Sequence, residues 1–141
     1  MHTYQDTFIA GMDYKELEGK KIQLKELMNY PLISLWHENE TYSIYHEFFA
    51  NHGLVFNPAI QTTSTGQVLG YTKGNLGIGW IHPKEAELAI DEKKVFNINV
   101  VEKMPKRHIA MVQDKNMDKK AVSIFEDILV NYVKEQKDIE L

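Results

Sequence analysis

The most informative pattern of polar and apolar positions lies in residues 62–83, which read TTSTGQVLGYTKGNLGIGWIHP. Ser64 and Gln67 have the spacing of a capping box, so we expect a helix to begin there. Gly74 suits the left-handed residue that ends a helix. The apolar run at 76–81 predicts a buried strand, and the two glycines inside it indicate that another group approaches its backbone closely. The segment therefore predicts a capped helix, a glycine turn and a buried strand in succession.

Strands and helices alternate through the rest of the chain. We expect strands at residues 3–10, 32–36, 55–62, 95–101 and 107–113, and helices at residues 22–27, 41–52 and 83–90 and after Asp118. This alternation is typical of βαβ units and a mainly parallel sheet, which places the chain in the α/β class. It also predicts that the strands at 32–36, 55–62 and 76–81 lie side by side in a single sheet.

The two ends of the chain fit this scheme less well. The strand that opens the chain has no local partner, and the last strand and helix lack an obvious sheet of their own. Within that helix, apolar residues at helical spacing predict a buried stripe made of Val122, Phe125, Leu129, Tyr132 and Val133. Both ends therefore indicate parts of a second layer of structure.

Composition narrows the class of protein. The chain has 141 residues, of which 43% are hydrophobic, so it can form one globular domain. It contains no cysteine, which excludes disulfides and thiolate metal sites. We find neither an apolar run long enough for a membrane span nor a signal-peptide pattern, so we expect a cytoplasmic protein without membrane contact. The net charge is −4 and Arg107 is the only arginine, which argues against direct binding of nucleic acid.

The sequence offers little for catalysis. Ser64 comes nearest to a nucleophile elbow but lacks the preceding glycine, and no phosphate loop occurs. His46 and Glu47 lack the second histidine of the HExxH zinc motif. The glycines within 74–79 have the dinucleotide-binding spacing in reverse and precede a strand, which argues against NAD. We therefore expect no catalytic residue, metal ion or cofactor. A small enzyme would need a cluster of titratable side chains that only the three-dimensional structure could reveal.

One feature points to a ligand. The predicted helix start at Thr63 and Ser64 offers hydroxyls and free backbone N–H groups beside a strand with two glycines. Helix N-termini of this kind bind small anions and polar ligands. Most capped helices bind nothing, so the ligand site is a hypothesis at this point.

Several segments, taken in order, resemble a known family. They include TFIAG, ELEGKKIQLKELMNYPLISL, a helix with paired phenylalanines before HGL, the capped helix with its glycine strand, and a returning strand with a closing helix; these lie at residues 7–11, 16–35, 40–57, 62–83 and 107–133. The set resembles the C-terminal effector-binding domain of LysR-type transcriptional regulators. Asn75 stands where that family usually has glycine, and Trp80 where it usually has a smaller apolar residue.

The resemblance implies a two-lobed α/β domain like the type II periplasmic binding proteins, with the effector in the cleft between the lobes. By position, residues 31–102 would form one complete lobe, and residues 1–30 and 103–141 would form part of the other lobe with the hinge strands. It also implies ligand contacts and dimer contacts. The ligand contacts are Ser34, Trp36, His37, Thr63, Ser64, Gly79 and Trp80, and the dimer contacts are Tyr42, Tyr45 and Phe49.

The function that the resemblance implies is effector binding and dimerisation for a LysR-type regulator. The helix-turn-helix of that family has no counterpart in this sequence, nor have the first elements of its first lobe. The effector would be a small anion or polar metabolite, and open strand edges favour a homo-oligomer. The alternative is a fragment of a solute-binding protein that feeds a transporter, against which the missing signal peptide argues.

Overall fold

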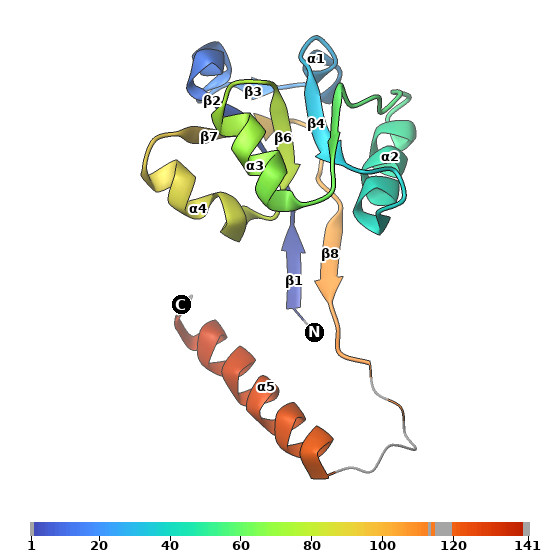
Figure 1. Ribbon diagram of the computed structural model, residues 1–141, viewed down its shortest axis with the longest axis vertical. Helices are drawn as coiled ribbons and strands as arrows, with labels where there is room; N and C mark the ends of the chain where they lie inside the picture. Colours follow the sequence, from blue (N-terminus) through green and yellow to red (C-terminus); the bar gives the residue numbers. More distant parts are fainter. Residues whose placement is uncertain (1, 113, 115–119, 140–141) are drawn as a thin grey trace. The chain divides into compact units, whose positions relative to one another are not determined.

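The computed structural model describes residues 2–112, 114 and 120–139 (Figure 1). These residues form eight strands, five α-helices and one 3₁₀ helix. In chain order they are β1 (His2–Gln5), β2 (Thr7–Gly11), η1 (Met12–Leu17), β3 (Lys21–Ile22), α1 (Leu24–Leu27), β4 (Leu32–Leu35), α2 (Glu40–Asn51), β5 (Ile60–Thr62), α3 (Thr65–Lys73), β6 (Ile78–Ile81), α4 (Pro83–Asp91), β7 (Val95–Val100), β8 (Lys106–Ile109) and α5 (Lys120–Ile139). The chain divides into a larger compact unit, residues 4–107, and a smaller one formed by the residues before and after it.

A six-stranded mixed sheet forms the centre of the larger unit. Its strands lie in the order β3-β7-β2-β6-β4-β5. Strand β4 is parallel to β5 and β6, and β3 is parallel to β7, whereas β2 runs antiparallel to β6 and β7. The predicted α/β class is confirmed, and β4, β5 and β6 lie side by side as predicted.

Helices cover both faces of this sheet (Figure 1). On one face, Val68 of α3 and Ala86 of α4 belong to a buried apolar cluster with the inward residues of the strands. On the other face, Phe49 of α2 packs in a larger cluster with Phe8 and Trp80. Burying each such side chain contributes about 1.5–3 kcal/mol, so these two clusters account for most of the favourable energy of the larger unit.

Helix α3 begins and ends close to the predicted residues. The Ser64 hydroxyl accepts a hydrogen bond from the Gln67 N–H at 3.3 Å, as predicted for the cap. The Gln67 side chain bonds the backbone N–H of Thr63 at 3.1 Å, one residue before the position that a capping box requires. At the other end, the left-handed residue is Asn75 (φ 61°) and not Gly74 (φ −78°), so that prediction is wrong. Asparagine adopts this conformation more readily than most residues.

The two glycines of the strand predicted at 76–81 are close to backbone and side chains of the protein itself. A Cβ on Gly79 would lie 2.4 Å from the Thr72 hydroxyl and 3.0 Å from Val68, both in α3. A Cβ on Gly77 would lie 2.4 Å from the carbonyl oxygen of Pro31. The predicted close approach is confirmed, and the group that approaches is protein and not ligand.

Several predicted bounds are wrong. The strand predicted at 55–62 is limited to β5, and the first predicted strand is interrupted at Asp6. Strands β2 and β3 belong to the same sheet as β4, within the larger unit at residues 4–107. The division into lobes at residues 31–102 stays a prediction. Gln113 and Asp118, which were predicted to end a strand and to cap the last helix, lie outside the described residues.

Strands β1 and β8 pair in a separate two-stranded sheet, which gives the first strand the partner that the sequence did not show. Within the smaller unit, the Thr3 hydroxyl and His108 Nδ1 lie 3.0 Å apart. Helix α5 contains 20 residues. The predicted burial of its stripe is wrong for Phe125 and Tyr132, which are both 58% exposed.

Candidate functional site

The carboxyl ends of β4, β5 and β6 meet at one edge of the sheet, because the three strands are parallel. Each strand is followed by a helix, so the N-termini of α2, α3 and α4 begin at this carboxyl edge. Side chains of Asn39, Ser64 and His82 cap the three helices by accepting backbone N–H groups. Helix N-termini carry partial positive charge, so this edge favours an anion.

Four of the predicted ligand residues lie together at the carboxyl edge and are exposed: Trp36, His37, Thr63 and Ser64. Strands β4 and β5 bring these residues together, because the Trp36 N–H donates to the carbonyl oxygen of Thr62 at 2.8 Å. The His37 N–H donates to the Gln61 side chain at 3.2 Å. Trp36 is 47% exposed, which is unusual for tryptophan and leaves an indole surface beside the start of α3.

The start of α3 offers unused hydrogen-bond donors. Within the described part of the chain, the backbone N–H groups of Ser64, Thr65 and Gly66 have no hydrogen-bond partner. The hydroxyl of Thr63 contacts the Gln67 side chain at 3.1 Å and remains exposed. These donors sit in one helical turn and can bind carboxylate or phosphate oxygens.

The other three predicted ligand residues are buried. Gly79 packs against α3, and Trp80 is 2% exposed with its ring stacked 3.6 Å from that of Tyr45. Ser34 is fully buried in β4. The Ser34 hydroxyl and the Trp80 indole N–H lack a hydrogen-bond partner among the described residues. Buried polar atoms normally have a partner, so these two retain hydrogen-bonding capacity just behind the carboxyl edge.

The predicted dimer contacts differ in their exposure. Tyr45 and Phe49 are 1% and 0% exposed, and both pack in the cluster around Trp80. Their side chains therefore have no surface to offer a partner. Tyr42 is half-buried, with its ring 5.3 Å from that of Phe56, so it is the one of the three predicted dimer contacts that keeps exposed surface.

The sequence did not indicate a buried polar cluster at the same edge. Asp6 is 3% exposed, and its Oδ2 accepts hydrogen bonds from the Tyr45 hydroxyl at 2.8 Å and from Arg107 Nη1 at 2.7 Å. Arg107 Nη2 donates to the Thr41 hydroxyl at 2.9 Å, at the start of α2. The one available signal was that the chain contains a single arginine, Arg107. The cluster joins the segment between β1 and β2, helix α2 and strand β8.

Burial and Asp6 together shift two pKa values in this cluster. Burial strongly raises the pKa of Tyr45, and the charge of Asp6 and its hydrogen bond add to the effect. Burial alone would lower the pKa of Arg107, but the hydrogen bond and charge of Asp6 outweigh it, so the pKa of Arg107 is raised. The phenol therefore stays neutral and the guanidinium charged throughout the physiological pH range.

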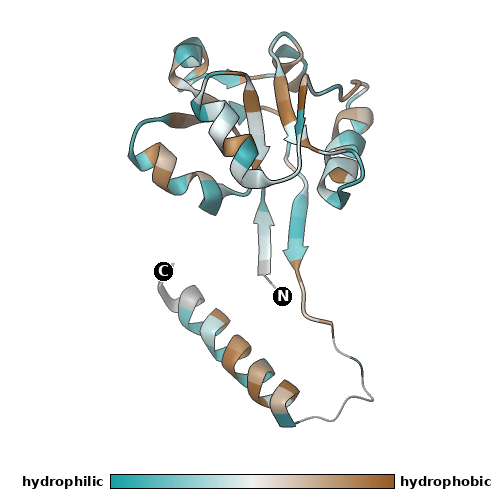
Figure 2. Cartoon of the chain, viewed as in Figure 1, coloured by the Kyte–Doolittle hydropathy of each residue, from teal (hydrophilic) through white to brown (hydrophobic). Residues whose placement is uncertain are grey.

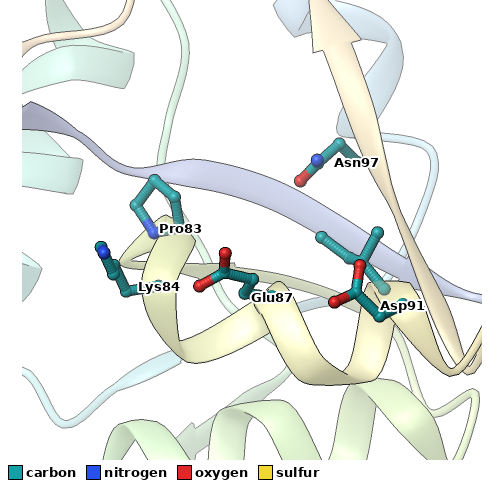
Figure 3. A pocket seen from close by; sticks show the side chains of 6 residues that line it. Pro83, Lys84, Glu87, Asp91 and Asn97 are labelled. Atoms are coloured by element: carbon teal, nitrogen blue, oxygen red, sulfur yellow. The ribbon is translucent and has the colours of Figure 1, made fainter. Parts of the chain in front are cut away.

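An open recess of about 340 Å³ lies along α4, and none of the predicted ligand residues lines it (Figure 3). Glu87 and Asp91 lie one turn apart on the helix and Asn97 projects from β7. The recess is lined by Pro83, Lys84, Glu87, Ile90, Asp91 and Asn97. Two carboxylates on one helix face are more often solvated surface than a binding site, so we do not include this recess in the candidate site.

A second recess, of about 280 Å³, lies where α3 and α4 end. It is lined by Met12, Lys73, Asn75, Lys93 and Lys94. Lysines near helix C-termini compensate the negative end of the helix dipole, which explains their position without a ligand.

Metal and membrane sites receive no support from the residues that the structure describes. Those residues contain no group of three or more histidine, aspartate or glutamate side chains that could hold a metal ion. None of the described helices combines the length and apolar character that crossing a membrane requires.

Comparisons with known proteins agree on one family. The family model described as the LysR substrate binding domain matches residues 5–134. The solved effector binding domain of QuiR in complex with shikimate aligns with a TM-score of 0.78 and 15% identity, over 94% of this chain and 63% of that chain. The regulatory domain of Synechocystis PCC6803 CcmR in complex with 2-PG gives 0.73 and 15%, over 92% and 63%. The cofactor-binding domain of the Cbl transcriptional regulator gives 0.62 and 15%, over 74% and 46%. A search of curated proteins finds no match.

These similarities confirm the predicted fold, which is like that of type II periplasmic binding proteins. The chain spans less than two thirds of the length of the three solved domains named above. The similarity to these domains concerns the fold and does not identify what binds to this chain.

Proposed function

Because the chain belongs to the LysR substrate-binding domain family, we propose that it binds a small-molecule effector on behalf of a transcription regulator. The observation that carries the proposal is the start of α3, where three backbone N–H groups are free beside the exposed side chains of Trp36 and His37. A helix N-terminus supplies directed donors and positive potential, and the indole supplies an apolar surface.

We place the effector among small anions that also carry an apolar or ring-shaped part. The donors of Ser64, Thr65 and Gly66 would bind its carboxylate or phosphate oxygens, and the ring of Trp36 would contact its carbon skeleton. The effector domain of QuiR holds shikimate and that of CcmR holds 2-PG, which supports a small polar ligand for this family. The buried Ser34 and Gly79 would act by shaping the wall and not by contact.

A single wall limits the affinity that we expect from this chain alone. Sites that bind small molecules tightly bury 70–90% or more of the ligand surface, and one wall cannot do so. We therefore propose dissociation constants of about 1 mM, which correspond to about 4 kcal/mol of binding free energy.

A binding assay with a matched pair of variants tests this proposal. The panel of probes comprises shikimate, 2-PG and a series of small dicarboxylates, measured by calorimetry and thermal shift. The Ser64 hydroxyl accepts the Gln67 N–H and keeps its own proton to donate to the anion. Ser64→Gly removes this donor but retains most of the capping ability, so we expect a loss of at least threefold in affinity with α3 intact. Ser43→Ala, on the exposed surface of α2, is the control and should bind as the wild type does. Binding that is equal in all three proteins, or absent for every probe, would contradict the proposal.

Three further parts of the proposal concern catalysis, assembly and location. The family is one of ligand-binding domains, so we propose binding without catalysis and a cytoplasmic regulator. The family match favours the regulator over the solute-binding alternative.

For a homo-oligomeric contact through α2, Tyr42 is the residue that we propose, since its ring is only half-buried. Tyr42→Ser should lower the apparent mass in sedimentation if α2 forms a contact.

A further inference from the structure

Arg107 lies at the carboxyl edge with part of its side chain exposed. Its Nη1 donates to Asp6 Oδ2 at 2.7 Å, and its Nη2 donates to the Thr41 hydroxyl at 2.9 Å. The side chain of Arg107 keeps 18% of its surface exposed, whereas that of Asp6 keeps 2%. The ion pair is therefore accessible from the side of the arginine and closed on the side of the carboxylate.

The contacts of this arginine leave hydrogen-bond donors unused. A guanidinium has five N–H groups in a planar fork. Among the residues that the structure describes, Asp6 and Thr41 accept two of them. The Thr41 hydroxyl accepts one N–H and keeps its own proton to donate. The remaining N–H groups and this hydroxyl form a donor set that suits carboxylate or phosphate oxygens.

Asp6 and Tyr45 hold the guanidinium near the end of β6. The Tyr45 hydroxyl donates to Asp6 Oδ2 at 2.8 Å and lies 3.2 Å from the carbonyl oxygen of Trp80, in β6. The guanidinium carbon lies 5.6 Å from the centre of the Tyr4 ring. Arg107 is thus fixed before a ligand arrives, so binding costs it little conformational freedom. Because Asp6 already offsets its charge, a ligand contact depends on directed hydrogen bonds more than on net charge.

The order of the strands places this arginine on the same edge as the start of α3. Neighbouring strands lie in the order β6-β4-β5, so Arg107 near the end of β6 and Ser64 after β5 are two strand spacings apart, or roughly 10 Å. Trp36 follows β4, between the two, and is 47% exposed. A short dicarboxylate with a hydrogen bond of about 2.8 Å at each end covers this distance.

We propose that Arg107 and Thr41 bind a second anionic group of the effector, whose first anionic group binds at the start of α3. The effector is then a small dianion, such as a dicarboxylate or a phosphorylated carboxylate, with its carbon skeleton across Trp36. The inference rests on the proposed function, because it names the chemical class of the ligand for that site. Neither Arg107 nor Thr41 is among the ligand contacts that the resemblance predicts.

A pair of ligands that differ by one carboxylate tests this assignment. Pentanedioate and pentanoate form such a pair, and amide chemical shifts at the start of α3 give both dissociation constants. The wild type should bind pentanedioate at least about tenfold more tightly, because only the dianion reaches both ends of the site. Arg107→Lys retains a positive charge beside Asp6 but loses the planar fork. It should reduce the preference for pentanedioate at least about threefold and leave the affinity for pentanoate unchanged.

Two further variants separate ligand binding from folding. Thr41→Val removes the hydroxyl at nearly constant size and should also lower the preference for pentanedioate. Lys106→Gln is the control, because Lys106 is exposed and adjacent residues of a strand point to opposite faces. It removes a neighbouring positive charge and should leave both affinities as in the wild type. A loss in Arg107→Lys that is equal for the two ligands would indicate a purely structural arginine and overturn the inference.

The remaining outcomes distinguish this inference from the proposed function. If both ligands shift the amides of α3 with equal affinity in the wild type, the site at α3 stands and the second subsite is overturned. The same holds if Arg107→Lys keeps the full preference for pentanedioate. If neither ligand shifts those amides, the proposed function fails and the inference fails with it.

Discussion

At the residue scale, Asp6 makes the most consequential contacts in the larger unit. Its carboxylate is buried and holds both the guanidinium of Arg107 and the phenol of Tyr45. Removing one partner from a buried ion pair costs more than the pair itself contributes, because the remaining charge is left without solvation. The cluster therefore makes the stability of the larger unit depend on a single arginine.

Replacement of Arg107 tests this dependence. We expect Arg107→Ala to lower the free energy of unfolding by about 2–4 kcal/mol, because Asp6 loses its positively charged partner. Arg107→Lys retains the charge and should cost less, although it loses the second hydrogen bond to Thr41. Urea unfolding of the two variants measures both values. Equal losses in the alanine and lysine variants would show that the charge is not what matters.

Tyr45 predicts how stability responds to alkaline pH. The pKa of Tyr45 is higher in the folded protein than the value of about 10 in the unfolded chain. Its contribution is therefore fully present below pH 10 and is lost above it, where only the unfolded chain releases the proton. The wild type should lose up to about 1.4 kcal/mol per pH unit more than Tyr45→Phe above pH 10. Unfolding curves of both proteins between neutral and alkaline pH provide the test, and parallel losses in the two would contradict it.

Replacing Gly79 or Gly70 by alanine should change the stability of the protein in opposite directions. Gly79→Ala would bring a methyl group against Thr72 and Val68 of α3, so we expect a loss of about 1–3 kcal/mol. Gly70 lies within α3 with open space at its Cβ position, and alanine is the better helix former, so Gly70→Ala should gain about 0.5–1 kcal/mol. Thermal unfolding measures both changes. A neutral Gly79→Ala would show that α3 can move away from the sheet.

At the element scale, local pattern was enough to predict the strands and helices that position the site. The cap at Ser64, the helix that follows it and the adjacent strands β4, β5 and β6 each depend on residues close in sequence, so their patterns appear there. The sheet partners of β2 and β3 could not be predicted, because antiparallel insertion of β2 between β6 and β7 depends on contacts distant in sequence. The left-handed residue was assigned to Gly74 instead of Asn75 because glycine is the commoner choice.

The residues of the candidate site likewise fall into those that the sequence could predict and those that it could not. Trp36, His37, Thr63 and Ser64, which the resemblance to LysR regulators predicted as ligand contacts, are exposed, and their role stays a prediction. Trp80 was also predicted at the surface of the site, but its alternation along β6 turns its ring toward α2. The Asp6 cluster was missed because its members are separated by up to about a hundred positions, and no local spacing links them.

The cap of α3 yields a prediction at this scale. Ser64→Ala removes the hydroxyl that accepts the Gln67 N–H, so it should lower the free energy of unfolding by about 1 kcal/mol. Ser64→Gly should lower the free energy of unfolding by only a few tenths of about 1 kcal/mol. Urea unfolding distinguishes the two variants. If neither variant costs anything, the hydroxyl contributes nothing to the helix. If Ser64→Gly costs as much as Ser64→Ala, it would be an unsuitable probe of binding.

At the scale of the whole molecule, the larger unit gathers the N-termini of α2, α3 and α4 at the carboxyl edge of its parallel strands, where we propose that the effector binds. Arg107, in the part of β8 that belongs to the larger unit, bonds both Asp6 and Thr41 at the start of α2. The proposed effector position therefore lies at the same edge of the sheet as this buried polar cluster.

Amide chemical-shift mapping most directly tests whether an effector binds at the start of α3. Addition of the panel of small anions to ¹⁵N-labelled protein should shift the amides of Ser64, Thr65 and Gly66 and the indole N–H of Trp36. The amides around Lys93, at the opposite edge of the sheet, should stay unchanged. Shifts confined to that opposite edge, or none with any probe at millimolar concentration, would contradict the central claim that this edge binds the effector.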